Sequence, residues 1–577
     1  MSKQPRSASV NFTQRINIFK IFLGFFAALI ILRLFVISVG RHSFYSAQAE
    51  NQHGYYQKLN PNRGDILVTD RYSSQPYPVA TNSHKDLVYV VPQDIKDPNA
   101  VASNLSKILS LDEKAISDKI GDQTKKYVPI QKMLTDDQSK AISQLKLAGV
   151  YLDQEDIRYY PEGEFLSQVL GFLGYKNNAD TKTGLYGIEK YLQKELAGAP
   201  GEIQTEADKQ GNWIAGAKRE FTPAVDGTTI QLTIDRAIQF KAESVLKDTV
   251  AKHGADSGSV IVADPKTGAI LAMANYPSFD PNLYNKVTDP GVFSNIATIE
   301  SYEPGSTMKA ITIATGIDMG VISPTSTYND TGEVDIAGYK IKNSDGKAHG
   351  VVPMTTVLDE SLNTGAIYVE QQIGNDKFLS SLKSFGFGQA TEIELPEATG
   401  NLSNLKGNIQ INYYTSAFGQ GITVTPLQML QSYMPLADGG KLMQPYIIDS
   451  KILPDGSVQK TQPKMLRQVI SARAATLVSG MLVDVVENGH GKKAAVKGYY
   501  IGGKTGTAQV ASKGVYVQND NIGSFLGYGP IEDPKFVMLV FVNHPRDVKF
   551  AESTAAPAFG EIAQFILNYY NIAPTRK

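Results

Sequence analysis

The stretch Glu303-Pro-Gly-Ser-Thr-Met-Lys309 constrains this chain more than any other part of its sequence. A proline and a glycine interrupt what precedes it, and apolar residues with helical spacing then follow: Ala310, Ile313, Ala314 and Ile317. This pattern predicts a helix with one buried face, with Ser306 at its N-terminus and Lys309 one turn later on the same side. A serine hydroxyl becomes a nucleophile when a nearby base takes its proton, and a lysine can be that base if burial or a neighbouring cation lowers its pKa. The motif Ser-x-x-Lys therefore predicts a paired nucleophile and base, although by itself it is common on solvated helices.

Two later tripeptides make this signal specific. Ser361-Leu-Asn363 lies where we expect a helix, around Thr355 to Thr364. Lys504-Thr-Gly506 lies in a glycine- and β-rich stretch, which predicts a strand that another molecule approaches closely. The order Ser-x-x-Lys, Ser-x-Asn, Lys-Thr-Gly is that of the penicillin-recognising serine enzymes. Each tripeptide is weak alone, but the three in order predict a serine acyl-transfer site.

Length and composition exclude several classes of protein. A chain of 577 residues predicts two or three domains beyond any membrane segment. A net charge of −1 and an ordinary charged fraction of 20% argue against a nucleic-acid binder. Cysteine is absent, so disulfides and thiolate metal sites are impossible. No pair of histidines has zinc-ligand spacing, and we expect neither a metal nor a cofactor.

The N-terminus predicts one membrane anchor, at residues 18–40. Basic residues precede the apolar run Ile21 to Leu32, which continues past Arg33 to Val39. The combined length suffices to span a bilayer, and the basic side, with the tail 1–17, is expected to stay in the cytoplasm. An uncleaved anchor is favoured over a signal peptide because the run is long for a cleaved apolar region.

Residues 41–225 predict a mixed α/β pedestal rather than a second enzyme. Short β-rich pieces alternate with helical ones, and no cluster of nucleophile, base and orienting group appears. Arg63-Gly-Asp65 is interpreted as a charged turn inside an assembly domain, not as a cell-adhesion tripeptide. Trp213, the only tryptophan, is expected in the core.

Residues 226–577 predict an α+β domain. Two hairpins are expected, Ser259 to Ala263 with Ala269 to Met273, and Ser524 to Gly529 with Phe536 to Asn543. With the strand of the Lys-Thr-Gly motif they give about five antiparallel strands. A closing helix and an internal helical insertion complete the expected domain.

By these features the chain resembles the class B penicillin-binding proteins, which are monofunctional peptidoglycan D,D-transpeptidases of the division or elongation type. Further pieces are similar to that family's framework: Arg63-Gly-Asp-Ile66 with Asp70-Arg71, Arg158-Tyr-Tyr-Pro161, Tyr186-Gly-Ile-Glu189, Leu232-Thr-Ile-Asp235, Pro277-Ser-Phe-Asp280, and Phe418-Gly-Gln-Gly421 with Thr425-Pro426. The resemblance implies a transpeptidase domain of the penicillin-binding and serine β-lactamase type. Such a domain has a five-stranded antiparallel sheet with helices on both faces and an all-helical part. A mixed α/β pedestal of the dimerisation type and one transmembrane helix would precede it.

The resemblance also implies a catalytic role for each motif residue. Ser306 would attack the carbonyl of the penultimate D-alanine of a stem peptide and form an acyl-enzyme, while Lys309 takes its proton. Lys504 would supply the neighbouring charge that keeps Lys309 neutral. Ser361 would relay a proton to the leaving amine. Asn363 would bind the substrate amide and help to hold Lys309.

Substrate binding is implied for the Lys-Thr-Gly motif and the residue after it. Lys504 and Thr505 would bind the terminal carboxylate by charge-assisted hydrogen bonds. Gly506 would allow the strand to approach the substrate. The backbone N–H groups of Ser306 and Thr507 would form the oxyanion hole.

The implied ligands and partners follow from the same resemblance. They are peptidoglycan stem peptides, as D-Ala-D-Ala donor and amine acceptor, and β-lactams, which mimic the donor and would trap Ser306 as a stable ester. The membrane, a polytopic glycan polymerase and other cell-wall machinery are the implied partners. Nucleic acid is not among them.

Other functions remain open at this point. Gly498-Tyr-Tyr-Ile-Gly-Gly-Lys-Thr505 satisfies the phosphate-loop pattern of nucleotide-binding proteins. That pattern needs a helix directly after the Lys-Thr, whereas Gly506 to Val510 predicts a strand. Within the same fold, a β-lactam sensor, a β-lactamase or a D,D-carboxypeptidase would reuse the three motifs. A catalytically silent cell-wall scaffold is the alternative from another class, and the intact motif residues oppose it.

Overall fold

The computed structural model describes residues 12–45, 54–73, 75–176, 181–206, 219–336, 338–512, 515–548 and 550–576. Trp213 lies outside the described residues, so its predicted place in the core is not tested. The chain forms two compact units, Met1–Asn62 with Gly198–Asp226, and Arg63–Ala197 with Gly227–Lys577.

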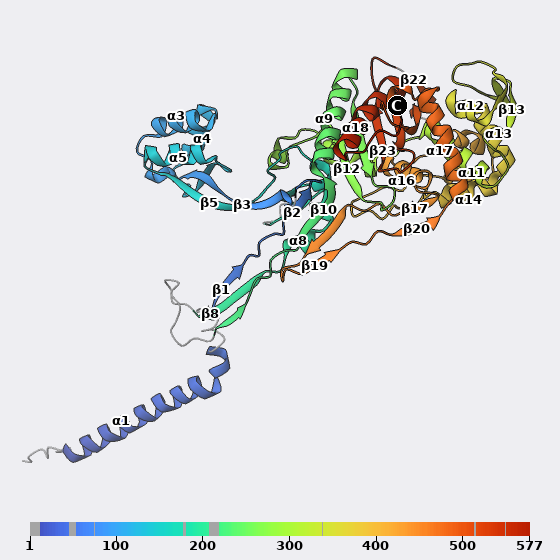
Figure 1. The fold of residues 1–577 in the computed structure, drawn as a ribbon. Helices are drawn as coiled ribbons and strands as arrows, with labels where there is room; N and C mark the ends of the chain where they lie inside the picture. Colours follow the sequence, from blue (N-terminus) through green and yellow to red (C-terminus); the bar gives the residue numbers. More distant parts are fainter. Residues whose placement is uncertain are drawn as a thin grey trace, which may run out of the picture. The chain divides into compact units, whose positions relative to one another are not determined.

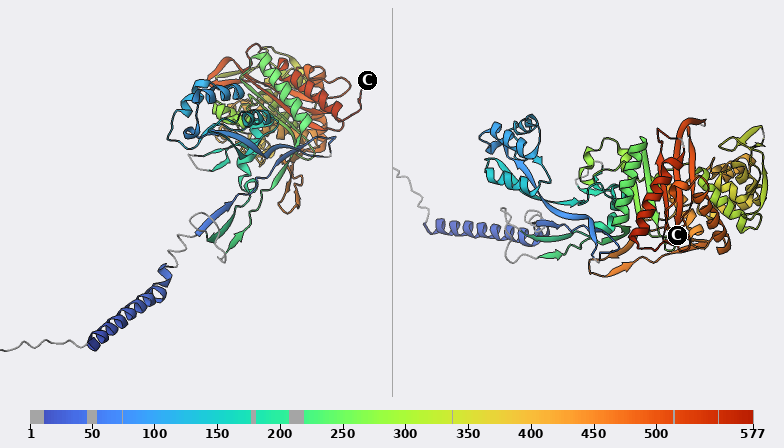
Figure 2. Two further views of the ribbon diagram at one scale, coloured as in Figure 1. Left: turned by 90° about the vertical axis from the view of Figure 1, so that its left-hand side faces the viewer. Right: turned by 45° about the horizontal axis from the view of Figure 1, so that its top comes forward.

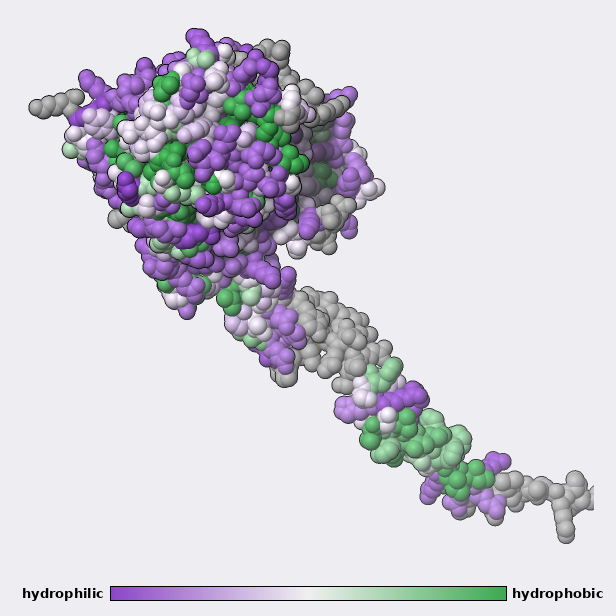
Figure 3. Space-filling model, turned by 90° about the vertical axis from the view of Figure 1, so that its right-hand side faces the viewer, coloured by the Kyte–Doolittle hydropathy of each residue, from purple (hydrophilic) through white to green (hydrophobic). Residues whose placement is uncertain are grey.

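The first unit contains an apolar helix and a small sheet. Helix α1 (Phe12–Phe35) continues into the π-helical turn η1 (Val36–Gly40). Among the described residues, Gln14–Gly40 is the one helical span that is long and apolar enough to cross a bilayer, and none of it is buried. Figure 3 shows its apolar surface in green along most of its length. This span contains the predicted anchor and fits single-pass anchoring. Three antiparallel strands form the sheet: β1 (Gly54–Leu59), β8 (Gly201–Glu206) and β9 (Glu220–Thr222).

A five-stranded sheet is the centre of the second unit (Figure 1). Its strands, in spatial order, are β12 (Ile270–Tyr276), β11 (Ser257–Ala263), β23 (Phe536–Asn543), β22 (Val515–Gly529) and β21 (Gly502–Ser512). All neighbouring pairs are antiparallel. The predicted sheet and its two hairpins are therefore confirmed.

Helices cover both faces of this sheet because its strands are apolar on both sides. Met538 and Val540 of β23 belong to one core cluster, together with α9 (Arg236–His253) and α18 (Ala555–Tyr569). Leu539, between them, belongs to the second cluster, as a side-chain period of two requires. Figures 1 and 2 show α9 and α18 side by side on the first face. The prediction of helices on both faces is confirmed.

The second cluster is shared with the all-helical part. Its α-helices are α10 (Ile296–Ile299), α11 (Met308–Asp318), α12 (Met354–Asp359), α13 (Asn363–Ile373), α14 (Asn375–Ser384), α15 (Gln410–Ala417), α16 (Pro426–Ala437) and α17 (Ala472–Glu487). Short 3₁₀ helices are η3 (Pro281–Lys286), η4 (Pro290–Phe293), η5 (Gly305–Thr307), η6 (Ser403–Leu405), η7 (Lys492–Ala494) and η8 (Ala551–Ser553). Three small antiparallel pairs are β13 (Thr327–Asp330) with β16 (Gly350–Pro353), β14 (Glu333–Ile336) with β15 (Tyr339–Lys342), and β17 (Lys441–Met443) with β20 (Met465–Gln468).

Helix α11, which follows the nucleophile motif, lies at the centre of this part. Every residue from Met308 to Ile317 is buried, because α13 and α17 pack against it from different sides. The predicted apolar face is therefore buried, and the other sides of the helix are buried as well. The sequence pattern showed the apolar face but gave no sign that Lys309 and two threonines of the same helix are also buried.

A mixed seven-stranded sheet joins strands from both sides of the predicted boundary at residue 225. Its strands are β2 (Ile66–Thr69), β3 (Tyr77–Val90), β4 (Val128–Gln131), β5 (Val150–Tyr159), β10 (Thr229–Asp235), β18 (Ile448–Ile452) and β19 (Val458–Lys460). β10 runs parallel to β2 and antiparallel to β18. The predicted domain boundaries stay predictions, but this sheet joins pedestal strands to the later part of the chain by backbone hydrogen bonds.

The rest of the pedestal is mixed α/β, as predicted. Helices α3 (Pro98–Leu109), α4 (Glu113–Ile120) and α5 (Asp136–Leu145) share a separate small core with β3 and β4. The remaining short elements are η2 (Pro92–Asp94), α6 (Ser167–Leu170), β6 (Leu173–Tyr175), β7 (Lys182–Gly184), α7 (Gly187–Tyr191) and α8 (Gln193–Ala197).

Three of the framework motifs meet at one buried ion cluster. Glu189 is fully buried, and its Oε2 accepts a hydrogen bond from Arg63 Nε at 2.7 Å. Its Oε1 accepts hydrogen bonds from Arg158 Nε at 2.7 Å and from the Tyr160 hydroxyl at 3.3 Å. A buried charge is costly unless it is paired, so the cluster fixes the relative positions of the segments that supply it. Arg63 is thus a structural residue of the pedestal.

Replacing Glu189 by Gln tests this role. The variant leaves two buried guanidinium groups without a carboxylate, and we expect it to destabilise the fold by about 3–5 kcal/mol. Denaturant unfolding followed by circular dichroism measures the change. The matched control is Glu162→Gln, which breaks an exposed ion pair with Arg236 of 2.8 Å and is expected to cost less than about 1 kcal/mol. Equal effects of the two variants would contradict a structural role for the cluster.

Candidate active site

The turn that carries Ser306 is held between two glycine-containing segments. Ser306 lies in η5, directly before α11, and is half-buried. The N–H of Gly305 donates to the carbonyl of Gly419 at 3.0 Å. A Cβ at Gly419 would lie 2.1 Å from the Gly305 carbonyl oxygen, and a Cβ at Gly305, whose φ is +57°, would lie 3.1 Å from the Thr507 carbonyl oxygen. Only glycine fits both places, so the Phe418–Gly421 motif and β21 fix the turn from two sides.

Lys309 is completely buried one turn into α11. Its Nζ donates hydrogen bonds to the backbone carbonyl of Ser361 and, at 3.2 Å, to Ser361 Oγ. Burial, and then the nearby charge of Lys504, lower the pKa of Lys309 well below its ordinary value. A lysine in this state can accept a proton near neutral pH, which is what a general base requires.

The segment around Ser361 is not one helix, and the prediction of a helix around Thr355 to Thr364 is wrong. α12 ends at Asp359, and α13 begins at Asn363. Between them Ser361 has a φ of +56°, and the N–H of Leu362 donates to the Val357 carbonyl at 2.9 Å. This is a Schellman-type helix end, in which glycine usually takes the left-handed position. The left-handed backbone costs a serine about 1–2 kcal/mol, and it turns the carbonyl and hydroxyl of Ser361 toward Lys309.

Asn363, the third residue of that tripeptide, is held by the small hairpin region of residues 327–353. Its Nδ2 donates to the Lys342 carbonyl at 2.8 Å. The next residue, Thr364, donates its hydroxyl to Asp330 at 2.7 Å. Among the hydrogen bonds of the described residues, Lys309 bonds to Ser361 and none joins it to Asn363. The structure thus places Asn363 at the start of α13 but does not bring it into the bond expected with Lys309.

Lys504-Thr-Gly506 lies on β21, the edge strand nearest the nucleophile turn. Lys504 is fully buried, and its Nζ donates to Thr505 Oγ1 at 3.2 Å. Burial lowers the pKa of Lys504 to about 7, opposed by the charge of Asp359. A Cβ at Gly506 would lie 2.5 Å from Ser524 Oγ, so glycine is required there. Because β21 ends the sheet, its outer edge can accept an extended peptide.

The same strand excludes the phosphate-loop interpretation. β21 continues from Gly502 through Lys504 and Thr505 to Ser512 without a helix. A phosphate loop needs a helix N-terminus directly after its Lys-Thr to bind the anion. The nucleotide-binding alternative is therefore wrong.

One carboxyl group that the sequence analysis did not single out, Asp359, interacts with Lys504. Asp359, the last residue of α12, is hydrogen-bonded to Asp484 of α17. Burial, this hydrogen bond and the charge of Asp484 raise the pKa of Asp359 to about 8. Lys504 opposes this rise, and Asp359 in turn raises the pKa of Lys504, so the two groups titrate as a coupled pair. The one feature of the sequence that could have identified Asp359 as part of the site is its position two residues before Ser361.

Comparison with protein families agrees with this arrangement. A model described as the penicillin binding protein transpeptidase domain matches residues 258–564. A second model, the penicillin-binding protein dimerisation domain, matches residues 58–232. The first match alone covers more than half of the chain. The chain belongs to the class B penicillin-binding proteins.

This class B penicillin-binding protein is similar to named relatives over most of its length. Stage V sporulation protein D of Bacillus subtilis is 34% identical over 526 residues, which are 90% of this chain and 80% of that protein. Peptidoglycan D,D-transpeptidase FtsI of Escherichia coli K12 is 30% identical over 527 residues, 90% of this chain and 85% of that protein. A crystal structure of penicillin binding protein 3 from Mycobacterium tuberculosis, complexed with aztreonam, has a TM-score of 0.68 at 25% identity. It covers 90% of this chain and 99% of that one.

The pKa of Lys504 predicts the pH dependence of acylation by a penicillin. The sequence predicts that a charged Lys504 binds the drug's carboxylate, and the second-order rate constant reports groups of the free enzyme. We expect this constant to fall as the pH rises through about 7, where Lys504 loses its proton. Asp359→Asn removes a group that raises the pKa of Lys504, so the fall should move to lower pH. Acylation rates measured across the pH range with a fluorescent penicillin test both statements.

The matched control is Asp455→Asn, which changes an exposed turn between β18 and β19. It should leave the profile unchanged. An alkaline fall that stays in place in Asp359→Asn would show that Asp359 does not act on Lys504.

Proposed function

We propose that this class B penicillin-binding protein cross-links peptidoglycan stem peptides through an acyl-enzyme on Ser306. The enzyme class, a serine-type D,D-transpeptidase, follows from membership of the family. The residue roles are proposed on the geometry of the site. The observation that carries them is the buried Lys309, which follows Ser306 by one helical turn and is hydrogen-bonded to Ser361.

Acylation begins with proton transfer from Ser306 Oγ to the neutral amine of Lys309. The serine oxygen bonds to the carbonyl carbon of the penultimate D-alanine, and the N–H groups of Ser306 and Thr507 stabilise the oxyanion. The C–N bond to the terminal D-alanine then breaks. Ser361 passes a proton to the leaving amine, since its Oγ lies 3.2 Å from Lys309 Nζ. Free D-alanine departs and an ester remains on Ser306.

Substrate binding also favours the neutral form of Lys309. Lys504 and Thr505 bind the terminal carboxylate, and an anion beside Lys504 raises its pKa and keeps it charged. That charge lowers the pKa of Lys309. Gly506 lets the peptide lie close to β21, and Asn363 binds the substrate amide from the start of α13. Binding of the substrate's carboxylate thus favours the neutral form of Lys309, which can then act as the base.

Cross-linking and inhibition begin with the same acylation of Ser306 and differ in what happens to the leaving amine. An amine from a neighbouring strand attacks the acyl carbon, gives its proton to Lys309 and forms the new amide bond. The ester C–O bond breaks, and Lys309 returns the proton to Ser306 Oγ, which frees the serine. A β-lactam acylates Ser306 in the same way. Its leaving nitrogen stays tethered to the acyl group, so the ester persists.

We extend the proposal to membrane topology and partners. Arg15 and Lys20 precede the most apolar part of the span Gln14–Gly40, and basic residues mark the cytoplasmic side of an anchor. The N-terminus would then be cytoplasmic and the catalytic unit extracytoplasmic. The family resemblance supports a polytopic glycan polymerase and other cell-wall machinery as partners of the anchor and pedestal.

Intact-protein mass spectrometry of the full-length chain with benzylpenicillin tests the assigned nucleophile. We expect one stable adduct with the full mass of the drug. Ser306→Ala should form none, because the variant lacks the hydroxyl that is proposed to attack the drug. Ser301→Ala, at an exposed position in the preceding segment, is the matched control and should react as the wild type does. An adduct that vanishes while hydrolysed drug accumulates would instead identify a β-lactamase, and an undiminished adduct on Ser306→Ala would contradict the assigned nucleophile.

A further inference from the structure

The helix α13, which begins with Asn363, is not capped by its own N-cap residue. That residue is Leu362, whose side chain makes no hydrogen bond to the helix. The first N–H groups of a helix have no partners within it, and a Ser, Thr, Asp or Asn at the N-cap usually supplies one. The start of α13 therefore needs an acceptor from another segment of the chain.

Asn343, directly after β15, supplies that acceptor. Its Oδ1 accepts a hydrogen bond from the N–H of Thr364 at 3.2 Å. The carbonyl of the preceding residue, Lys342, accepts the hydrogen bond of 2.8 Å from Asn363 Nδ2. Two successive residues of one segment thus bind two successive residues of α13, and one of these two is the asparagine of the Ser-x-Asn motif.

Asp330, at the end of β13, holds Asn343 in the orientation that this cap requires. Asp330 is 1% exposed. Asn343 Nδ2 donates to both of its oxygens, at 3.1 Å and 2.9 Å, so the amide oxygen of Asn343 is left to face α13. The Thr364 hydroxyl donates to Asp330 Oδ1 at 2.7 Å. The N–H groups of Gly332 and His349 donate to the same carboxylate at 3.0 Å and 2.9 Å. All these groups are donors, and a carboxylate, which only accepts, satisfies them, whereas an amide cannot.

The charge of Asp330 suits its place beside a helix N-terminus. Burial would raise the pKa of Asp330, but the hydrogen bonds that it accepts, first that of Thr364, outweigh burial and lower this pKa below its ordinary value. The carboxylate is therefore charged near neutral pH. Its bond to Thr364 places it at the first turn of α13, where the helix dipole favours an anion.

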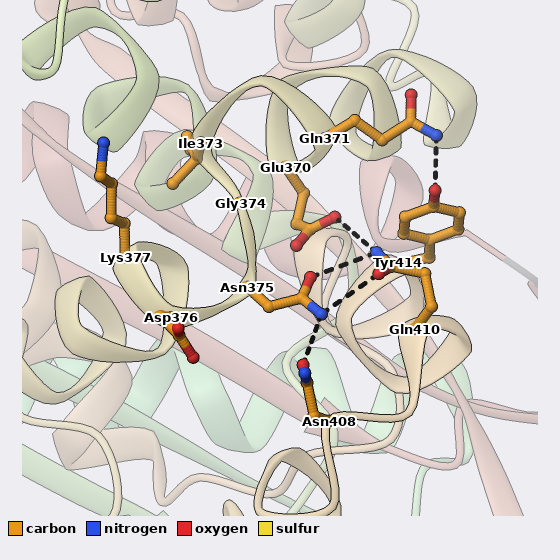
Figure 4. Close-up of a pocket in the computed structure, with 10 residues that line it drawn as sticks. All are labelled: Glu370, Gln371, Ile373, Gly374, Asn375, Asp376, Lys377, Asn408, Gln410 and Tyr414. Atoms are coloured by element: carbon orange, nitrogen blue, oxygen red, sulfur yellow. Dashed lines mark hydrogen bonds between the residues drawn. The ribbon is translucent and has the colours of Figure 1, made fainter.

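The other end of α13 is fixed by different contacts. Gln371 Nε2 donates to the Tyr414 hydroxyl at 2.6 Å. Just after the helix, Asn375 Nδ2 donates to Asn408 Oδ1 at 2.7 Å, and Figure 4 shows both bonds. The helix is thus held at each end, and the hydrogen bonds of Asp330 reach only the end that carries the catalytic motif.

We propose that Asp330 is a positioning residue of the transpeptidase: by holding the cap of α13 it fixes the direction of the Asn363 side chain. Binding of the substrate amide by Asn363 is the part of this inference that rests on the proposed function. A displaced Asn363 loses that amide contact, whereas the contacts of β21 with the terminal carboxylate stay as they are. Asp330 therefore sets how strongly the enzyme prefers substrates that carry the amide.

Acylation of the full-length protein by two penicillins tests this inference. Benzylpenicillin carries an amide on its β-lactam ring, and 6-aminopenicillanic acid has the same fused rings and carboxylate but a free amine. Asp330→Asn should lower the second-order rate constant of benzylpenicillin about tenfold more than that of 6-aminopenicillanic acid, the effect of losing about one hydrogen bond. Asn363→Ala gives the reference change in the ratio of the two rate constants. The double variant should change this ratio no further than Asn363→Ala does.

Variants of two other α13 residues serve as the controls. Thr364→Val removes one donor to Asp330 and should change the ratio in the same direction, whereas Thr364→Ser keeps the hydroxyl and should not. Gln371→Ala removes a hydrogen bond at the other end of the same helix and should keep the wild-type ratio. Circular dichroism shows whether each variant is folded, and the two Thr364 variants decide the question if Asp330→Asn is not.

The outcomes separate this inference from the proposed function. Equal losses for the two penicillins in Asp330→Asn, or a wild-type ratio in Thr364→Val, would overturn the inference and leave the transpeptidase intact if Asn363→Ala still changes the ratio. A wild-type ratio in Asn363→Ala would contradict amide binding by this residue and overturn the inference with it. A wild-type protein that neither penicillin acylates would contradict the proposed function itself.

Discussion

The removal of the Lys309 amine from water is the constraint on which the rest of the catalytic unit depends. A buried lysine loses its charge readily, and a second buried lysine, Lys504, on the neighbouring strand strengthens the effect. Two amines stay adjacent only if α11 and β21 are held rigidly together. Gly305 and Gly506 permit that approach because they have no side chains. The two hydrophobic cores on either face of the sheet hold the helix and the strand in position.

Neighbouring charged groups set the ionisation of buried side chains near Ser306, and they also compensate buried charges far from it. Asp359 raises the pKa of Lys504, and the charge of Lys504 lowers the pKa of Lys309. Farther away, the ion cluster at Glu189 is paired on both sides and serves structure, not catalysis. Where every buried charge has its partner, the arrangement stabilises the fold. Where a buried charge has no partner, it marks a site at which a substrate can supply the opposite charge.

The sequence predicts what local periodicity and motif order determine, and fails where distant segments meet. Alternating apolar residues predict both hairpins of the sheet, and the order of the three motifs predicts which groups surround Ser306. The left-handed conformation of Ser361 was not foreseen, because glycine usually takes that position at a helix end. The partnership of Asp359 with Asp484 joins two helices far apart in the chain, and no pattern in either helix reveals it.

The ionisation state of Lys309 is the most direct test of this account. NMR of protein labelled with ¹³C at the lysine ε carbon, recorded across the pH range, measures it, and Lys309→Arg identifies the resonance by its loss. We expect a resonance that titrates well below the ordinary pKa of 10.5. Lys504→Gln removes the neighbouring charge and should move that titration to higher pH. A Lys309 that remains charged up to about pH 10 would contradict the assignment of this residue as the base.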